Sequence, residues 1–361
     1  MIPNRCRRGR ILLRVVVFVV LLGIGVVLLL ASTLALAYQG FPTPVILDFP
    51  KGTSTQQMAD QLADAGVVRY PWQFVLARLL HPAARLQAGE YQFTHPDTTW
   101  NVFNRIVRGD IFFYQLTVPE GSNMFDIAGL LKQFDFLNSD EFLKAARDPS
   151  LIRDLAPNAP TLEGYLFPST YRLTRRTTVR DLCQMMTDQF RRHWKELQKP
   201  HPAVPVNDTV ILASLVEKET AIPAERPLVA SVFENRLRLG MPLDCDPTTI
   251  YSALLDQRYH GTIYKSDLES TNPYNTYQHA GLPPGPIANP GVASLKAALA
   301  PATSDYLYFV AKADGSGGHQ FSKTMDEHNR AVQSYRRTIR QPDPPPPPPA
   351  PHANRRHARK A

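Results

Sequence analysis

The hydrophobic positions divide the chain into one long apolar run, a segment of short alternating patterns and a segment of long helical patterns. The apolar run extends without interruption from Val15 to Ala37. At a helical rise of about 1.5 Å per residue, it can cross a bilayer core of roughly 30 Å. The pattern therefore predicts a transmembrane helix over residues 15–37, with a signal sequence cleaved between Ala31 and Ala37 as the alternative.

Arginine is concentrated just before this run, at positions 5, 7, 8, 10 and 14. Because positive flanks stay on the cytoplasmic side, residues 1–14 are predicted to be cytoplasmic and the rest to lie outside the cytoplasmic (inner) membrane, in the periplasm. Most of the remaining net charge of +8 lies in residues 341–361, whose prolines predict a disordered basic tail. The body between them is near neutral, which argues against nucleic acid as a partner.

A weak internal repeat with an offset of 69 residues follows the anchor. Each copy has a β-rich run, over 45–49 or 112–118, then a Pro-x-Gly turn and a helical pattern that Ser54 or Ser122 is predicted to cap. Between the copies we predict a strand over 88–93 and a helix over 100–107 that begins at Thr98 or Thr99.

These elements loosely resemble the LysM carbohydrate-binding module. We therefore predict LysM-like modules over residues 44–160, with a spacer that lifts the next domain from the membrane as the alternative.

Residues 161–340 carry longer helical patterns separated by loops rich in proline and glycine. Helices are predicted over 178–197, 209–220, 223–239, 247–255, 292–299 and 324–339, with Gly240 as a C-cap, and a hairpin over 305–311 and 318–321. The predicted fold class is α+β, with a mainly helical C-terminal domain that contains a small β element.

The three cysteines and the scattered histidines supply little chemistry. Only Cys183 and Cys245 share the exported side, where a disulfide between them is allowed but not required. No Cys/His spacing matches a metal site and no lysine stands out as a Schiff-base former, so we expect neither a metal nor a cofactor.

The helix predicted over 209–220 is almost wholly apolar and ends in two glutamates separated by a lysine. One stripe at helical spacing contains Leu212, Leu215, Val216 and Glu219. Glu219 therefore continues an apolar face, while Glu217 points elsewhere. A desolvated carboxyl has a raised pKa and can act as a general acid. The spacing by itself leaves open that both glutamates only mark the solvated end of a buried helix.

The string Ala-Ser-Leu-Val-Glu-Lys-Glu-Thr in this helix is followed by further motifs in a fixed order. They are Glu225-Arg226, Asn235-Arg236-Leu237, Asp246-Pro247-Thr248, Tyr274-Asn275-Thr276-Tyr277, Gly281-Leu-Pro-Pro-Gly-Pro-Ile287 and Tyr308-Phe309-Val310. Together they resemble the endolytic murein transglycosylase (YceG-like) family, and the match runs from the anchor to about Arg337.

This resemblance implies a catalytic domain over 161–340 that cleaves peptidoglycan glycan strands, with Glu219 as the acid/base. A lytic transglycosylase attacks the MurNAc–GlcNAc bond with the sugar's own 6-hydroxyl, so one carboxyl suffices where a glycosidase needs two. The implied product is a 1,6-anhydroMurNAc end. Cleavage of nascent strands would end their elongation, which implies coupling to peptidoglycan synthases in the same membrane.

Other polar and aromatic motif residues are candidates for substrate binding. Aromatic faces and carboxylates suit a sugar groove, although aromatic residues in loops often serve packing instead. Arg236 is expected either to balance Glu217 or Asp246 or to bind a peptide carboxylate. The candidates are Glu163, Tyr165, Asn235, Arg236, Asp246, Thr248, Tyr274, Asn275, Thr276 and Tyr277.

Two other functions remain open from the sequence. In a non-catalytic peptidoglycan-binding scaffold, the same groove would hold glycan and Glu219 would be structural. A hydrolase would need a second carboxylate across the cleft, from Glu163 or Asp246, and would leave reducing ends.

Overall fold

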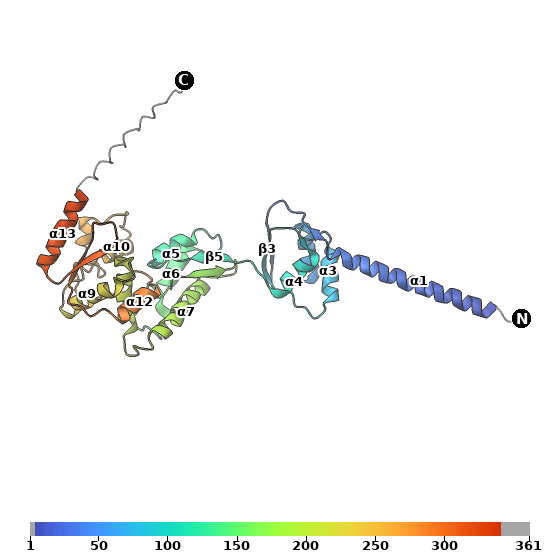
Figure 1. Cartoon of the computed structure of the whole chain (residues 1–361), viewed down its shortest axis with the longest axis horizontal. Helices are drawn as coiled ribbons and strands as arrows, with labels where there is room; N and C mark the ends of the chain where they lie inside the picture. The colour runs from blue at the N-terminus through green and yellow to red at the C-terminus, as the bar shows by residue number, and fades with distance from the viewer. Residues whose placement is uncertain (1–3, 341–361) are drawn as a thin grey trace, which may run out of the picture. The chain divides into compact units, whose positions relative to one another are not determined.

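The computed structural model describes residues 4–340 and consists of two compact units (Figure 1). Unit 1 comprises Met1–Gln115 and Arg172–Arg176, and unit 2 comprises Leu116–Tyr171 and Thr177–Ala361. The tail predicted over 341–361 lies outside the described residues. The division differs from the boundary predicted at residue 160, because helices between 124 and 146 pack in unit 2.

The apolar run forms most of helix α1 (Asn4–Thr33), and Leu13–Thr33 is long and apolar enough to cross a membrane. The helix ends at Thr33 instead of the predicted Ala37. Leu34 turns back into the core of unit 1, where it is only 4% exposed. A single helix of this kind is consistent with a single-pass membrane anchor.

Three helices and two antiparallel strand pairs form the remainder of unit 1. The core between them includes Phe74 and Phe103, whose rings meet edge to face at 5.7 Å. Ser54 caps α2 by accepting from Gln57 N, and Thr98 caps α4, as the sequence predicts. The elements are β1 (Ala37–Tyr38) with β4 (Asp97–Thr98), β2 (Val45–Phe49) with β3 (Gly89–Phe93), α2 (Thr55–Asp64), α3 (Pro71–Leu80) and α4 (Thr99–Arg108).

The second copy of the repeat is β5 (Tyr114–Thr117) followed by α5 (Met124–Leu131). Its cap is Asn123, not the predicted Ser122, because the offset of 69 residues places Asn123 opposite Ser54 and its side chain accepts from two backbone N–H groups. Since α2 belongs to unit 1 and α5 to unit 2, the two copies are not tandem modules of one domain. A LysM identity is not confirmed for either copy.

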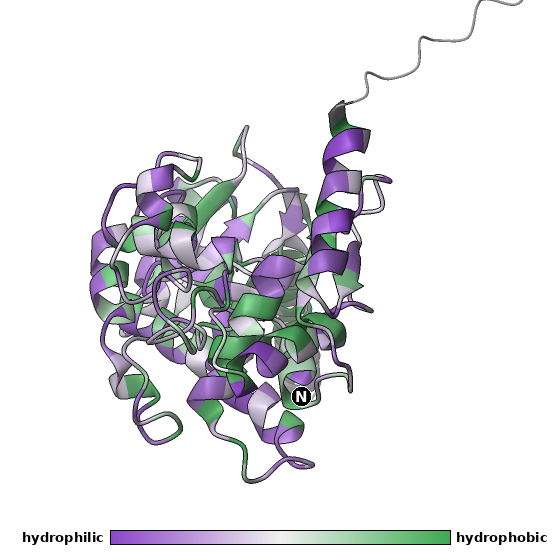
Figure 2. Ribbon diagram, turned by 90° about the vertical axis from the view of Figure 1, so that its left-hand side faces the viewer, coloured by the Kyte–Doolittle hydropathy of each residue, from purple (hydrophilic) through white to green (hydrophobic). Residues whose placement is uncertain are grey.

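Unit 2 is mainly helical, and its hairpin lies where the sequence predicts it. α8 (Val206–Glu219) is its central helix, buried on every side from Thr209 to Val216 and packed against α9, α10 and α12. In contrast, α13 is largely hydrophilic along its length (Figure 2). The other elements are α6 (Ser139–Ala146), a 3-10 turn (Pro149–Leu151), β6 (Thr170–Leu173) paired with β5, α7 (Val179–Leu197), α9 (Arg226–Arg238), α10 (Asp246–Leu255), α11 (Lys265–Leu268), α12 (Val292–Leu299), β7 (Tyr308–Ala311), β8 (His319–Ser322) and α13 (Met325–Arg340).

Candidate active site

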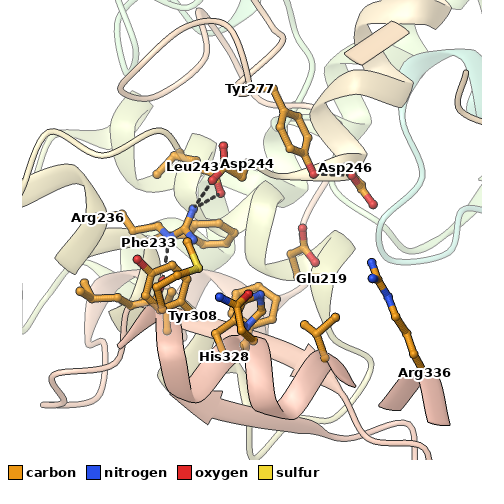
Figure 3. Close-up of a pocket in the computed structure, with 16 residues that line it drawn as sticks. Glu219, Phe233, Arg236, Leu243, Asp244, Asp246, Tyr277, Tyr308, His328 and Arg336 are labelled. Carbon is orange, nitrogen blue, oxygen red and sulfur yellow. Dashed lines mark hydrogen bonds and ion pairs between the residues drawn. The ribbon is translucent and has the colours of Figure 1, made fainter. Parts of the chain in front are cut away.

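A cavity of about 540 Å³ lies at the C-terminal end of α8, within unit 2 (Figure 3). Glu219, the last residue of α8, lies in its wall. α9 contributes Phe233 and Arg236, and β7 and α13 close the remaining side. The loop before α10 and the first residue of α10 contribute Asp244 and Asp246. The cavity therefore combines a carboxyl on an apolar helix with polar and aromatic walls, as a polar ligand requires.

Glu219 is half-buried, and the three apolar residues predicted to share its stripe, Leu212, Leu215 and Val216, are buried. Burial raises the pKa of Glu219 above its ordinary value, and the negative charge of Asp246 raises it further. A hydrogen bond from Cys245 and the nearby His319 oppose this shift. Burial is the largest of these influences, so the pocket favours the protonated form of Glu219 more than water does.

Cys245 donates its thiol proton to Oε1 of Glu219 at a sulfur–oxygen distance of 3.0 Å. Burial and the adjacent Glu219 carboxyl raise the pKa of this thiol well above 9.0, so it remains a donor. Thr276 Oγ1 accepts from the Cys245 backbone N–H and fixes the residue. Both Cys183 and Cys245 are buried and unpaired, so the disulfide that the sequence allows is not formed.

Arg236 pairs with Asp244, and the predicted pairing with Glu217 or Asp246 is wrong. Its Nη1 lies 2.9 Å from Asp244 Oδ2, its Nε donates to the Leu307 carbonyl, and its guanidinium covers the ring of Tyr308 at 5.0 Å. Asp244 has a φ of 50°, in the left-handed region. Such a conformation persists only where neighbouring contacts enforce it. Arg236 thus fixes one wall of the cavity.

Glu217 faces away from the cavity, as its position on the helix predicts. It accepts from Arg226 at 3.0 Å and from the backbone N–H of Gly291 at 2.9 Å, and both partners of the ion pair are nearly inaccessible to solvent. Because a buried carboxylate requires such a partner, this pair has a structural explanation, and of the two glutamates Glu219 is the one that lines the cavity.

Asp246 and Tyr277 form a second polar pair in the cavity wall. Tyr277 donates its hydroxyl to Asp246 Oδ1 at 2.6 Å. Figure 3 shows Asp246 and Arg336 on the same side of the cavity as Glu219. Four of the predicted site residues therefore meet at one cavity, namely Glu219, Arg236, Asp246 and Tyr277.

The other predicted site residues are not among those that line the cavity. Glu163 is fully buried, and its carboxyl accepts from Met124 N, Tyr251 Oη and Asn289 Nδ2. Burial raises its pKa to about 8. The remaining six pack in the interior or hold loops through hydrogen bonds and ring contacts: Tyr165, Asn235, Thr248, Tyr274, Asn275 and Thr276.

Sequence reasoning missed the contributions of Asp244, Tyr308 and the α13 face. His328 and Arg336 lie on one face of that helix, eight positions apart, and both line the cavity. The polar face of an amphipathic helix could have indicated them. Among residues 4–340, no three His, Cys, Asp or Glu side chains are grouped so that they could hold a metal ion.

Comparison with known proteins places this site in a family. The model of the YceG-like family matches residues 47–334. An endolytic murein transglycosylase of Bacillus subtilis is 33% identical over 312 residues, which cover 81% of this chain and 85% of that protein. An endolytic murein transglycosylase of Streptococcus pneumoniae is 28% identical over 321 residues, and this chain covers 58% of its length.

A crystal structure gives the same result. A yceG-like protein from Listeria monocytogenes is similar to this chain with a TM-score of 0.53 and 30% identity, over 80% of this chain and 98% of that one. The family match extends into both units and covers every residue that lines the cavity except Arg336. The chain belongs to the YceG-like family.

Proposed function

We propose that this protein is an endolytic lytic transglycosylase that cleaves the MurNAc–GlcNAc bond of peptidoglycan and leaves 1,6-anhydroMurNAc ends. The observation that carries the proposal is the protonatable carboxyl of Glu219 in the wall of a polar cavity. The names of the relatives from Bacillus and Streptococcus support the substrate class.

In the proposed reaction, Glu219 donates its proton to the glycosidic oxygen as the bond to C1 of the muramoyl sugar breaks. The 6-hydroxyl of the same sugar attacks C1, and the Glu219 carboxylate accepts the hydroxyl proton. Cys245 stabilises that carboxylate by its hydrogen bond, while the charge of Asp246 favours positive charge at C1. Intramolecular attack replaces the bound water that a hydrolase must position.

The test is digestion of purified peptidoglycan by the full-length chain in detergent, with mass spectrometry of the released ends. We expect anhydromuramoyl ends from the wild type and a loss of about 10²- to 10⁴-fold in rate for Glu219→Gln, because the amide cannot transfer the proton. Glu234→Gln, on the exposed side of α9, is the matched control and should retain full activity. A folded wild type that binds glycan without cutting it would instead identify a scaffold.

A hydrolase is the second candidate, because Asp246 gives the cavity another carboxylate. Glu163 cannot serve in this role, since its carboxyl is fully buried. Reducing ends, with their loss in Asp246→Asn, would establish hydrolysis. Anhydro ends that persist in Asp246→Asn would leave transglycosylation as the reaction.

The proposed location is the cytoplasmic membrane, with residues 1–14 inside and the cavity in the periplasm or its equivalent. Leu34 supports an uncleaved anchor, because its side chain is buried in unit 1 and its carbonyl accepts from Trp100 N at 3.2 Å. Attachment to this membrane would hold the enzyme near nascent strands and peptidoglycan synthases, where cleavage ends strand elongation.

A further inference from the structure

Helix α3 has an apolar face that is open to solvent, whereas an ordinary surface helix has a polar one. Trp72 is 41% exposed, Leu79 is 70% exposed and Leu80 is 52% exposed. Trp72 and Leu79 lie on one face at a spacing of seven residues, with the partly buried Leu76 between them. The opposite face, with Phe74 and Ala77, already fills the core of unit 1. α3 is therefore apolar on both faces.

Helix α3 contacts the end of α1 near its own N-terminus and shares a pocket with α1 near its C-terminus. Near its N-terminus, Gln73 Nε2 donates to the Thr33 carbonyl at 3.4 Å. Near its C-terminus, Leu80 lines a pocket of about 370 Å³ together with Ala31 and Leu34. The helix thus lies across the point where α1 ends, and Figure 1 shows α3 beside that end of α1.

Aromatic and basic residues precede the helix. Tyr70 stacks on Trp72 with ring centroids 6.3 Å apart and is itself 47% exposed. The Arg69 guanidinium lies 5.6 Å from the centre of the Tyr70 ring. Tyrosine and tryptophan concentrate at the headgroup level of bilayers, and arginine binds anionic headgroups there.

We propose that α3 is an interfacial helix that lies in the headgroup region of the bilayer that α1 spans. The partner of this exposed face is the lipid surface. The apolar segment of α1 ends beside α3, so the exposed face of α3 meets the bilayer where the anchor leaves it. The proposal rests on the membrane anchor stated above and adds that unit 1 contacts the membrane through a second element.

The experiment uses the full-length chain with Cys6→Ser, in bilayer discs of phosphatidylethanolamine and phosphatidylglycerol that hold one chain each. A single cysteine is introduced at Leu79, at Val20 within α1 or at exposed Gln56 on α2, and is labelled with nitrobenzoxadiazole. The native Cys183 and Cys245 are buried, so the introduced thiol is the reactive one. Lipids with a nitroxide near the headgroup report contact by quenching.

We expect the Leu79→Cys label to emit at shorter wavelength and to be quenched at least about twofold more than the Gln56→Cys label, since only the former enters the interface. Quenching at Val20→Cys, by a nitroxide deeper in the acyl chain, verifies the anchor. If Val20→Cys is quenched and Leu79→Cys behaves like Gln56→Cys, the interfacial helix is wrong and the anchor stands. If Val20→Cys is not quenched, both the interfacial helix and the anchor are wrong.

A second copy of the chain would instead cover α3 if the Leu79→Cys label shifts to shorter wavelength only in discs with two chains and is not quenched by lipid.

Discussion

At the residue scale, Glu219 is subject to opposing influences on its pKa. Burial and the Asp246 carboxylate raise the pKa, whereas the Cys245 thiol and His319 lower it. The thiol is the only one of these groups that the structure shows in a hydrogen bond with Glu219 among the described residues. Cys245 therefore acts as a positioning residue, because it touches the proposed acid and tunes when the proton is released.

Replacing Cys245 should change the pH dependence of cleavage. In Cys245→Ala the lost hydrogen bond raises the pKa of Glu219, so the alkaline limb of the kcat/KM profile should move to higher pH, because Glu219 must be protonated to act as the acid. Cys245→Ser restores a donor and should move the limb back. The check is the profile of all three proteins on one soluble glycan. Equal loss of rate at every pH would mean that the thiol serves packing only.

At the element scale, Glu163 joins segments that are distant in the sequence. Its three hydrogen-bond partners are 39, 88 and 126 residues away, at the start of α5, in α10 and before α12. All three are donors, so both carboxyl oxygens must accept. Burial nevertheless outweighs these bonds and raises the pKa to about 8, so the folded protein retains a proton that the unfolded chain loses.

Glu163→Gln should therefore destabilise the protein without removing a cavity residue. The amide NH₂ must face at least one donor, which costs about 1–3 kcal/mol in the free energy of unfolding. In the wild type, this free energy should fall as pH rises from about 4.5 towards about 8, because only the unfolded chain ionises Glu163 over that range. The variant should lack this slope.

Denaturant unfolding between pH 5 and pH 8 measures both effects. The exposed carboxylate variant Glu141→Gln is the control and should stay within about 0.5 kcal/mol of the wild type. A pH slope in Glu163→Gln as steep as in the wild type would assign the titration to another group.

At the scale of the whole molecule, each of the two units has aromatic residues in a core of its own. Phe103 belongs to the core of unit 1, and Phe190 packs between Tyr165 and Trp194 in unit 2. All the residues that line the cavity belong to unit 2. Unit 1 can therefore change in stability without rearranging the site.

We expect scanning calorimetry of the full-length chain in detergent to show two transitions. Phe103→Ala should lower the temperature of one transition and Phe190→Ala that of the other. In each case the cause is the loss of about 3–5 kcal/mol of core packing. Below its lowered transition, Phe103→Ala should cleave soluble glycan at the wild-type rate. A single transition that either variant shifts as a whole would show that the two units unfold together.

Local signals in the sequence predicted most of the elements. Strand β2 and helix α12 have the predicted bounds, and α7 begins one residue after the predicted start at Thr178 and ends at the predicted Leu197. Helix α11 was missed because its four residues make barely one turn, which is too short for a periodicity, and α3 and α6 were missed as well. Residues 116–160 were predicted to belong with the N-terminal modules and pack with unit 2, because the two copies of the repeat lie in different units.

The sequence by itself determined the apolar helix, the order of the elements and the position of Glu219 at the end of a buried stripe. These depend on spacing along one helix, which the chain carries locally. Only the tertiary structure decided which polar motif residues reach the cavity. Glu163 and Asn275 are as polar as Asp246, yet partners from distant segments bury them, and α13 supplies a wall in their place. Long-range hydrogen bonds and burial determine which of these residues reach the cavity, and such contacts leave no periodic pattern in the sequence.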